Sequence, residues 1–164
     1  MIAIEPIATA NVAPYKSIRL RALQDTPTAF SATYSEEAKF TDADWLMRAS
    51  QLSSTKSTGY LALDSGVAVG IAAGFLDRND PSRAELVSMW VAPTHRRQGI
   101  GRLLVEAVSD WARAQNIPSL LLLVTSNNHA AIAFYQRLGF SLTGKTEPYR
   151  NDPALSNFEM IRPN

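Results

Sequence analysis

The chain has 164 residues, of which 46% are hydrophobic and 19% are charged, and its formal net charge at pH 7 is +1. This size and composition predict one globular domain, residues 1–164. The near-neutral charge argues against a general nucleic-acid surface, so any basic site must be local. Cysteine is absent and there are two histidines, which argues against disulfides, a metal site and a cysteine nucleophile.

The chain shows no targeting or membrane signal. No apolar run approaches the roughly 18 residues of a membrane span. Residues 1–10, MIAIEPIATA, lack the basic flank and the long apolar stretch of a secretory signal. We therefore expect a cytoplasmic protein without membrane association.

The N-terminal half is predicted to form a strand, two helices and an antiparallel meander. Alternating apolar residues indicate strands, and apolar residues three and four apart indicate helices. Thr41 and Asp44, which precede an apolar run, are typical of a helix start. The expected elements are a strand at 2–7, a helix at 12–23, a loop at 25–40, a helix at 41–52, two strands within 59–76 around an Asp64-Ser65-Gly66 turn, and a strand at 85–91.

After the strand at 85–91, the C-terminal half is predicted to continue with a helix, a strand, a second helix and a closing hairpin. Pro118 closes the first helix, and the continuously apolar SLLLLVT at 119–125 is typical of a strand covered on both faces. Asn128 is a favourable N-cap for the second helix, which Gly139 ends, and residues 140–146 and 157–162 form the hairpin. The residues expected on the buried face of the first helix are Ile100, Leu103, Leu104, Ala107, Val108 and Trp111.

The stretch HRRQGIG, residues 95–101, places two arginines and two glycines in front of the first of these helices. Glycine is costly inside a helix but useful where the backbone takes a positive φ or where another group approaches it closely. The unpaired amides and the dipole of a first helical turn favour an anion, and Arg96 and Arg97 add positive charge. The residues alone leave open a phosphate-binding loop and an ordinary surface loop with solvated arginines.

Two motifs resemble the GNAT superfamily of N-acetyltransferases. Residues Arg96 to Gly101 match its acetyl-CoA signature Q/R-x-x-G-x-G/A, and NHAAIAFYQRLGF, residues 128–140, resembles its N-x-x-A-x-x-x-Y-x-x-x-G-F segment. The resemblance is strong over the C-terminal half and general over the first 58 residues. It implies a mixed α/β fold: a central, mostly antiparallel sheet of six to seven strands with a splayed parallel pair, flanked by about four helices.

The resemblance also implies acetyl-CoA as the cosubstrate. The amides of Gln98 to Leu103 would bind the pyrophosphate, and an amide near Met89 to Val91 would hold the thioester oxygen. Asn128 resembles the asparagine that touches the CoA arm, although an N-cap explains it as well. The residues expected to contact the cofactor are Trp90, Val91, Ala92, Pro93, Arg96, Arg97, Gln98, Gly99, Ile100, Gly101, Arg102, Leu103, Asn128 and Tyr135.

Acetyl transfer to an amine requires a base, because an amine with a lysine-like pKa of about 10.4 is protonated at neutral pH. Glu85 is the candidate, because its offset from Val91 matches the general-base glutamate of histone-type members of the superfamily. The period of two predicts that both residues lie on one face of the strand, and a solvated carboxylate is the alternative. Tyr135 resembles the general acid that protonates the departing thiolate, with a packed core tyrosine as its alternative.

Further candidate residues have two interpretations each. The arginines meet the distal phosphates of CoA or lie on solvated helix faces. The histidines are alternative bases or solvated side chains, and the aromatic residues line an acceptor pocket or pack the N-terminal helices onto the sheet. These residues are Arg102 and Arg137, His95 and His129, and Phe30, Tyr34 and Trp45.

The resemblance therefore predicts an acetyl-CoA-dependent N-acetyltransferase that transfers the acetyl group directly to a primary amine of a small molecule or a peptide. The alternatives are a catalytically idle CoA-binding or regulatory module and an acyltransferase with another acyl donor or acceptor. Leu123 occupies the position where ribosomal-protein N-terminal acetyltransferases carry a glutamate, which argues against that activity. The sequence names neither the acceptor amine nor the oligomeric state, for which a homodimer is one option.

Overall fold

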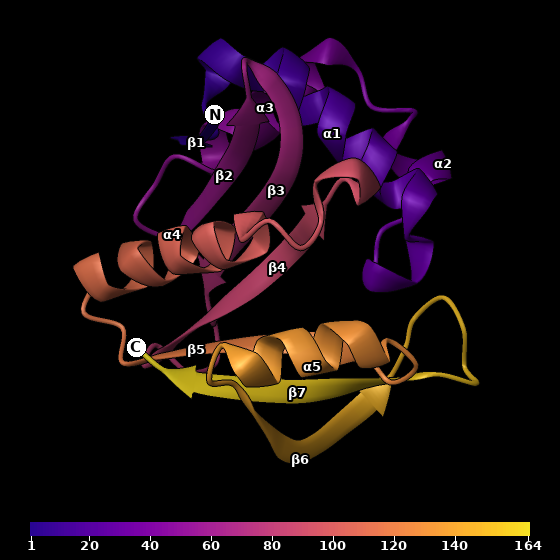
Figure 1. Ribbon diagram of the computed structural model, residues 1–164, viewed down its shortest axis with the longest axis vertical. Coiled ribbons are helices and arrows are strands. Elements are labelled where there is room, and N and C mark those ends of the chain that lie inside the picture. Colours follow the sequence, from indigo (N-terminus) through magenta and orange to yellow (C-terminus); the bar gives the residue numbers. More distant parts are fainter.

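The computed structural model describes all 164 residues and contains one seven-stranded sheet with the strand order β1-β2-β3-β4-β5-β7-β6 (Figure 1). Every neighbouring pair is antiparallel except β4 and β5, which are parallel. The predicted, mostly antiparallel sheet with one parallel pair is thus confirmed. The strands are β1 (Ile2–Pro6), β2 (Ser57–Asp64), β3 (Val67–Leu76), β4 (Arg83–Val91), β5 (Ser119–Thr125), β6 (Ser141–Pro148) and β7 (Ser156–Pro163).

Five helices flank the sheet: α1 (Val12–Asp25), α2 (Tyr34–Glu37), α3 (Asp42–Gln51), α4 (Ile100–Ala114) and α5 (His129–Arg137). Helix α1 packs on β3, whereas α4 packs on the opposite face against β2, β3 and β4, and Figure 1 shows α4 and α5 in front of the strands. A capping box between Thr41 and Asp44 starts α3, as predicted. None of the helices combines the length and the apolarity that crossing a membrane requires.

The segment 25–40, predicted as a loop, contains a 3-10 turn (Pro27–Ala29) and the short helix α2. One helical turn offers no apolar periodicity from which it can be predicted. The side chain of Thr33 caps α2 by accepting a hydrogen bond from the Glu36 N–H group. This turn of helix turns Glu37 inward, where its side chain is buried.

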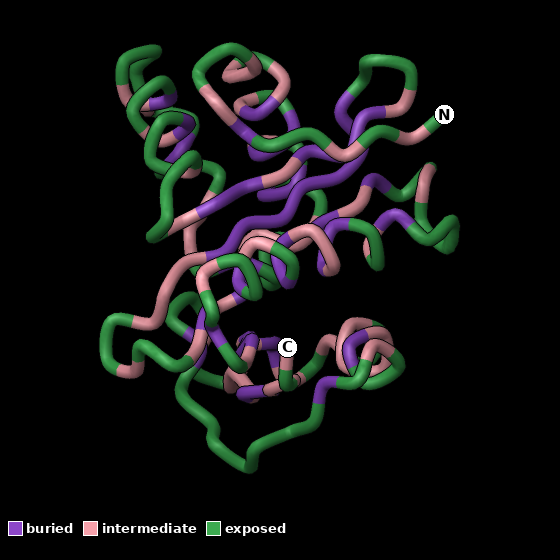
Figure 2. The backbone as a smooth tube through the Cα atoms, turned by 90° about the vertical axis from the view of Figure 1, so that its left-hand side faces the viewer, coloured by how far each residue is buried: buried purple, intermediate pink, exposed green.

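The apolar core is one continuous cluster of 31 buried residues, and Figure 2 shows buried residues concentrated along the central strands. In α4 the buried face contains Ile100, Leu104 and Val108, as predicted. Leu103, also expected there, is 48% exposed. The buried stripe lies on the Val105 side of the helix instead, because the way α4 crosses the strands decides which of its neighbouring apolar rows is covered.

Strands β4 and β5 separate at their C-terminal ends. Their pairing covers only residues 83–86 of β4 and 119–122 of β5, although β4 continues to Val91 and β5 to Thr125. The unpaired halves diverge near the centre of the sheet (Figure 1). This register confirms the predicted splayed parallel pair.

A β-bulge interrupts β4 just beyond the last residue that pairs with β5. Two residues of β4, Ser88 and Met89, lie opposite one residue of β3, because the register shifts between Ile71 and Ala73. Ser88 has a φ of 58°, which lies in the left-handed region that residues with a Cβ rarely adopt. The bulge therefore places a strained residue where the sheet opens.

The bulge corrects one prediction about the faces of β4. Glu85 pairs with Phe75, whereas Val91 pairs with Gly70. Phe75 and Gly70 are separated by an odd number of positions along β3. Because paired residues share a face and alternate residues change face, Glu85 and Val91 lie on opposite faces. The expectation that they share one face is wrong, and Glu85 shares its face with Trp90 instead.

Candidate active site

The loop before α4 exposes a row of free backbone amides. None of the N–H groups from Arg96 to Arg102 donates to an acceptor in the protein, whereas the Leu103 N–H donates to the Gly99 carbonyl at 3.2 Å. Free amides at the start of a helix, together with the helix dipole, fit an anionic group such as a diphosphate. The amides of Gln98 to Arg102 are thus available as predicted, and that of Leu103 is not.

The two glycines of this loop serve different purposes. Gly99 has a φ of 81° and open space around its Cβ position, so it is required for the left-handed backbone. A Cβ at Gly101 would lie 3.0 Å from Met89 Cε and 3.0 Å from the ring of Phe134. Gly101 therefore lets α4 pack closely against β4 and α5.

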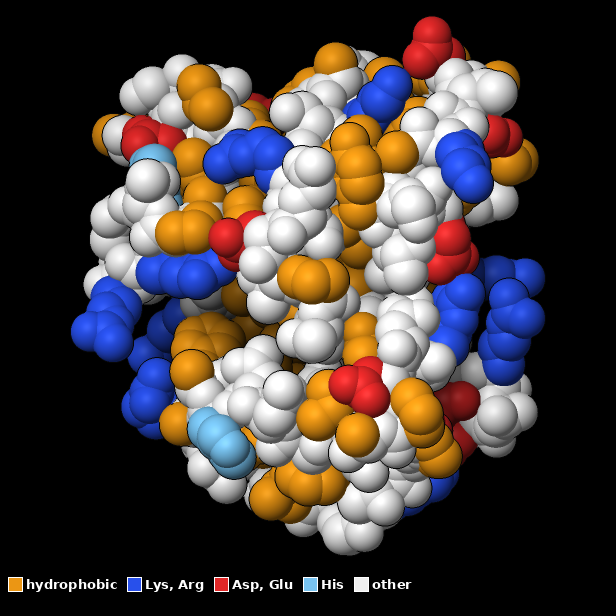
Figure 3. Space-filling model, turned by 90° about the vertical axis from the view of Figure 1, so that its right-hand side faces the viewer, with side chains coloured by type: hydrophobic (Ala, Val, Ile, Leu, Met, Phe, Trp, Pro, Cys, Tyr) orange, Lys and Arg blue, Asp and Glu red, His pale blue; other side chains and the backbone are white.

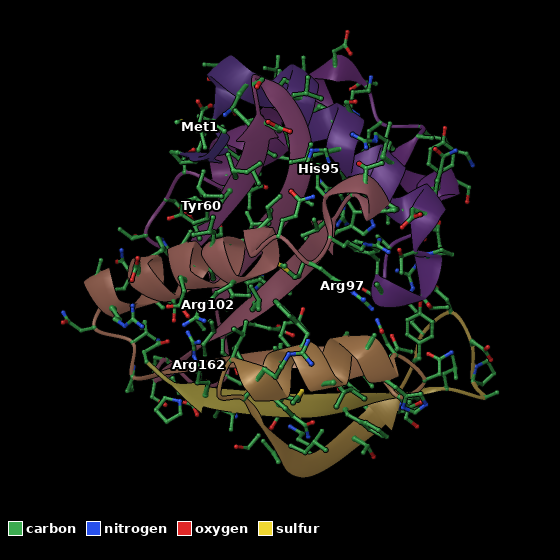
Figure 4. All side chains as sticks on the ribbon, viewed as in Figure 1. Met1, Tyr60, His95, Arg97, Arg102 and Arg162 are labelled. Atoms are coloured by element: carbon green, nitrogen blue, oxygen red, sulfur yellow. The ribbon has the colours of Figure 1, made fainter.

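Two exposed arginines, Arg97 and Arg102, belong to the free-amide segment, and a third, Arg137, lies on α5. Arg97, Arg102 and Arg137 are exposed, and no carboxylate lies within ion-pair distance of them. Figure 4 shows Arg97 extending into the space between the loop and α5. In Figure 3, Lys and Arg side chains gather along one side of a recess whose floor is apolar, so this side of the molecule suits an anionic ligand.

The Arg96 guanidinium was expected to add positive charge beside the loop, but it is paired with a carboxylate. Its Nε donates to the Val91 carbonyl at 2.8 Å, and its Nη2 donates to Asp25 at 2.9 Å. The Trp90 indole N–H also donates to Asp25, at 3.0 Å. Hydrogen bonds, the largest from the Thr26 hydroxyl, hold the pKa of Asp25 below its ordinary value. Arg96 thus fastens the end of β4 to α1 while its own amide stays free.

The end of β4 offers fewer free backbone groups than the resemblance implied. The Ala92 N–H donates to the Val69 carbonyl at 2.8 Å, the Val91 carbonyl accepts from Arg96, and Pro93 has no N–H. The bulge residues 88 and 89 lie outside the regular pairing with β3. Of residues 89–91, near which the resemblance places the donor to the thioester oxygen, Met89 lies in this bulge.

A cavity of about 290 Å³ lies where β4 and β5 diverge, and both predicted catalytic side chains line it. Residues 85–89 of β4 and 123–125 of β5 contribute two walls, and α5 contributes Tyr135. Residues 28–31 and 147–150, which are remote in sequence, complete the lining. The cavity thus joins the divergence of the parallel pair to the segments on either side of it.

Glu85 is half-buried, and its pKa is shifted toward neutrality. Burial raises its pKa most, and neighbouring charges shift the pKa further, so that it moves from 4.5 to about 7. A group with this pKa takes up and releases a proton at neutral pH, as a general base must. This partial burial argues against a fully solvated strand-end carboxylate, and the role of Glu85 as a base stays a prediction. The raising charges are those of Asp77, Glu147 and Glu159, and Arg83 lowers the pKa.

Tyr135 is a core residue and a cavity residue at once. It is 8% exposed, and its ring packs against Phe134 and Phe140 with centroids 5.2 and 5.7 Å away. Its hydroxyl has no partner in the protein, and burial raises its pKa above the ordinary value, so it keeps its proton. Asn128, which also lines the cavity, caps α5 by accepting from the Ala131 N–H at 3.2 Å.

Neither histidine lines the cavity. His95 is neither a base in the cavity nor a fully solvated side chain, because its Nε2 lies 2.8 Å from Asp64 Oδ2 and its Nδ1 lies 2.8 Å from the Thr94 hydroxyl. His95 therefore ties the start of the loop to the β2–β3 turn. His129 is exposed on α5, as expected.

The aromatic candidates separate into three environments. Phe30 lines the cavity, Trp45 packs in the core, and Tyr34 is 38% exposed and lies outside the cavity. Leu123 also lines the cavity, so this position of β5 presents no carboxylate to it.

A set of hydrogen bonds across the cavity, which we call the clasp, had no counterpart in the sequence analysis. The Tyr149 hydroxyl donates to the Phe30 carbonyl at 2.6 Å and lies 3.1 Å from the Pro27 carbonyl. Arg150 donates to the Ser31 carbonyl at 3.1 Å. The clasp joins the loop between β6 and β7 to the segment after α1. Only folding brings these segments together, because more than 110 residues separate them.

Comparison with known proteins identifies the family of this chain. Residues 20–140 match the family described as Acetyltransferase (GNAT) family. N-acetyltransferase family 8 member 3 of Rattus norvegicus is 36% identical over 113 residues, which are 63% of this chain and 49% of that protein. The chain spans about half the length of the curated relatives that it matches.

Solved structures share the fold. A GNAT-family acetyltransferase from Streptococcus pneumoniae superposes with a TM-score of 0.82 at 22% identity over 99% of both chains. The yncA protein of Salmonella typhimurium, solved with its cofactor acetyl-CoA, superposes with a TM-score of 0.79 at 21% identity over 99% of this chain and 94% of that chain. Because the family match covers most of the chain, including the free-amide loop and Tyr135, the chain belongs to the GNAT acetyltransferase family.

Proposed function

We propose that the protein is an N-acetyltransferase that moves the acetyl group of acetyl-CoA directly to the nitrogen of a small primary amine. The observation that carries this proposal is the cavity that Glu85 and Tyr135 share in the gap between β4 and β5. A catalytically idle CoA-binding module has no need of a half-buried carboxylate whose pKa is close to neutral.

The loop before α4 fits the cosubstrate. The free amides of residues 97–102 and the exposed guanidinium groups of Arg97 and Arg102 would hold a diphosphate. Acetyl-CoA supplies an acetyl group that is activated as a thioester. The Salmonella relative, which was solved with acetyl-CoA, supports the same cosubstrate here.

Glu85 prepares the acceptor. The amine arrives as an ammonium, and the Glu85 carboxylate takes one proton from it, directly or through a water molecule. The freed nitrogen forms the new C–N bond to the thioester carbonyl carbon, and the C–S bond breaks. Because the transfer is direct, no protein nucleophile is needed, which agrees with a chain without cysteine.

Tyr135 completes the proton balance. Its hydroxyl gives a proton to the departing sulfur, which leaves as the free thiol of CoA. The nitrogen, acidified by its new bond to the carbonyl carbon, releases a second proton that restores the tyrosine. The products are an acetamide and CoA, and the proton on Glu85 passes to solvent before the next cycle.

The lining of the cavity favours a small cationic acceptor. Glu85 and Glu147 line it without an ion-pair partner, whereas the lining arginines Arg19 and Arg150 are each paired with a glutamate. The surplus negative charge attracts an ammonium group. The clasp bounds the cavity and favours a small molecule over an extended peptide.

The test is an assay of CoA thiol release with acetyl-CoA and a panel of small amines, amino acids and short peptides. We expect thiol release with a small amine and a product heavier by one acetyl group. Calorimetry that shows no acetyl-CoA binding would remove the proposal. Binding without release for every amine would favour the idle module, and release only with another acyl donor or a hydroxyl acceptor would favour the other alternative.

A further inference from the structure

A buried arginine on α1 holds the bulge of β4. The Nη1 of Arg19 donates to the Ser88 hydroxyl at 2.9 Å. The Nε and Nη2 of the same guanidinium donate to the two carboxylate oxygens of Glu37 at 2.9 and 3.0 Å. One planar group thus connects α1, α2 and the bulge.

The burial of this ion pair points away from a purely stabilising role. Arg19 is 7% exposed and Glu37 is 2% exposed. The guanidinium lies over the Phe30 ring at 5.0 Å, and Arg48 lies 3.5 Å from the second oxygen of Glu37. Removing two charges from water costs about as much as their attraction returns, so apolar residues would stabilise this site equally well. What the pair adds is a fixed geometry.

Ser88 needs that geometry. Its φ of 58° costs a residue with a side chain about 1–2 kcal/mol, and such strain persists only where the surroundings impose it. The Ser88 oxygen already accepts from Arg19, so its own proton is left to donate elsewhere. Ser88 and Met89 line the cavity, and no acceptor in the protein receives this proton.

We propose that Arg19 is a positioning residue for acetyl transfer, which acts through Ser88 to aim the Ser88 hydroxyl proton at the thioester carbonyl oxygen. The inference rests on the proposed function. Negative charge grows on that oxygen when the amine attacks, and a donor that is already in place stabilises this charge without reorganisation. Glu37 fixes the orientation of the Arg19 guanidinium.

Two conservative variants test the proposal without removing the buried charge. Ser88→Ala removes the hydroxyl and leaves the Arg19–Glu37 pair intact. Arg19→Lys keeps the charge, but one ammonium group cannot reproduce the three bonds of the fork. For both variants we expect kcat to fall roughly 10- to 100-fold, with the calorimetric Kd for acetyl-CoA changed by less than about twofold. The loss is the same for every accepted amine, because the acetyl side of the reaction is affected.

Matched controls are Ser17→Ala, on the exposed side of α1, and Arg113→Lys, at the end of α4, which should keep kcat. Infrared spectroscopy of acetyl-CoA labelled with ¹³C at the carbonyl supplies a readout without turnover. We expect the carbonyl band of the bound thioester to move to higher frequency in Ser88→Ala and Arg19→Lys, since a lost hydrogen bond leaves the carbonyl less polarised.

Three results would overturn the inference: kcat unchanged in both variants, an unmoved carbonyl band, or a weakening of acetyl-CoA binding as large as the loss of kcat, which would assign Arg19 a purely structural role. If the wild-type protein binds acetyl-CoA but acetylates no amine, the proposed function fails. The carbonyl band still tests the position of Ser88 in that case, because it is measured without an acceptor.

Discussion

Replacing Glu85 with glutamine should lower activity and stabilise the fold. The pKa of Glu85 rises from 4.5 to about 7 on folding, so between these values the folded protein binds a proton that the unfolded chain has released. Stability from this group is therefore fully present below pH 4.5 and is lost as the pH rises through 7. Glutamine resembles the protonated acid at every pH, so the variant does not lose this stability when the pH rises.

The magnitude follows from the pKa. A tenfold change in an acid constant corresponds to 1.36 kcal/mol, so the full rise is worth an upper limit of about 3 kcal/mol. The cavity is open to water, and solvent screening reduces the expected gain to about 1–2 kcal/mol at pH 8. For a chain of this length, the gain corresponds to a rise in Tm of about 2–8 °C.

Urea unfolding at pH 8 and at pH 5 measures the effect, with Glu5→Gln on the exposed side of β1 as the matched control. We expect Glu85→Gln to gain stability at pH 8 and to approach the wild type toward pH 5. The wild-type kcat should rise with pH and level off above about 7. In the variant, kcat should no longer rise in this pH range. An equal gain at both pH values, or a loss at pH 8, would refute the assignment of a half-buried carboxylate with a raised pKa.

The remaining predictions concern the acid, the charge around the base and the loop. Tyr135→Phe should lower kcat by about 10²- to 10⁴-fold and leave the calorimetric Kd for acetyl-CoA nearly unchanged; equal losses would assign the tyrosine to binding. Glu147→Gln removes a charge that raises the Glu85 pKa, so the acid limb of kcat should move to lower pH, and an unmoved limb would show that the two carboxylates are independent. Gly101→Ala should cost roughly 1–3 kcal/mol in urea unfolding, because the new Cβ would lie 3.0 Å from Met89 Cε and 3.0 Å from the Phe134 ring; an unchanged or higher stability would contradict the close packing of α4 against α5.

The features that the sequence predicted correctly have local causes. The capping box of Thr41 and Asp44 and the N-cap of Asn128 involve side chains three residues from their partners, so the sequence alone contains both members of each bond. The left-handed Gly99 lies next to the helix whose amides it frees. The free-amide loop and most element boundaries could therefore be predicted from the sequence alone. The prediction that Leu103 is buried was wrong, because α4 has two neighbouring rows of apolar residues and only one of them can pack against the sheet.

The site residues depended on segments far apart in the chain. Arg19 interrupts the apolar stripe of α1, which was a readable anomaly, but its partners Glu37 and Ser88 lie 18 and 69 residues away. The bulge that moves Glu85 and Val91 to opposite faces exists only as a register between two strands, and hydrophobic periodicity carries no register.

By itself, the sequence determined four of the five helices, the strands and the free-amide loop, whereas the roles of Glu85 as base and Tyr135 as acid stay predictions. Only the tertiary structure decided that Arg96 pairs with Asp25, that the clasp bounds the cavity, and that Glu85 has a pKa close to neutral. The physical reason is that hydrogen bonds within a turn are specified by neighbouring residues, whereas desolvation and charge pairing depend on which distant side chains the fold brings together.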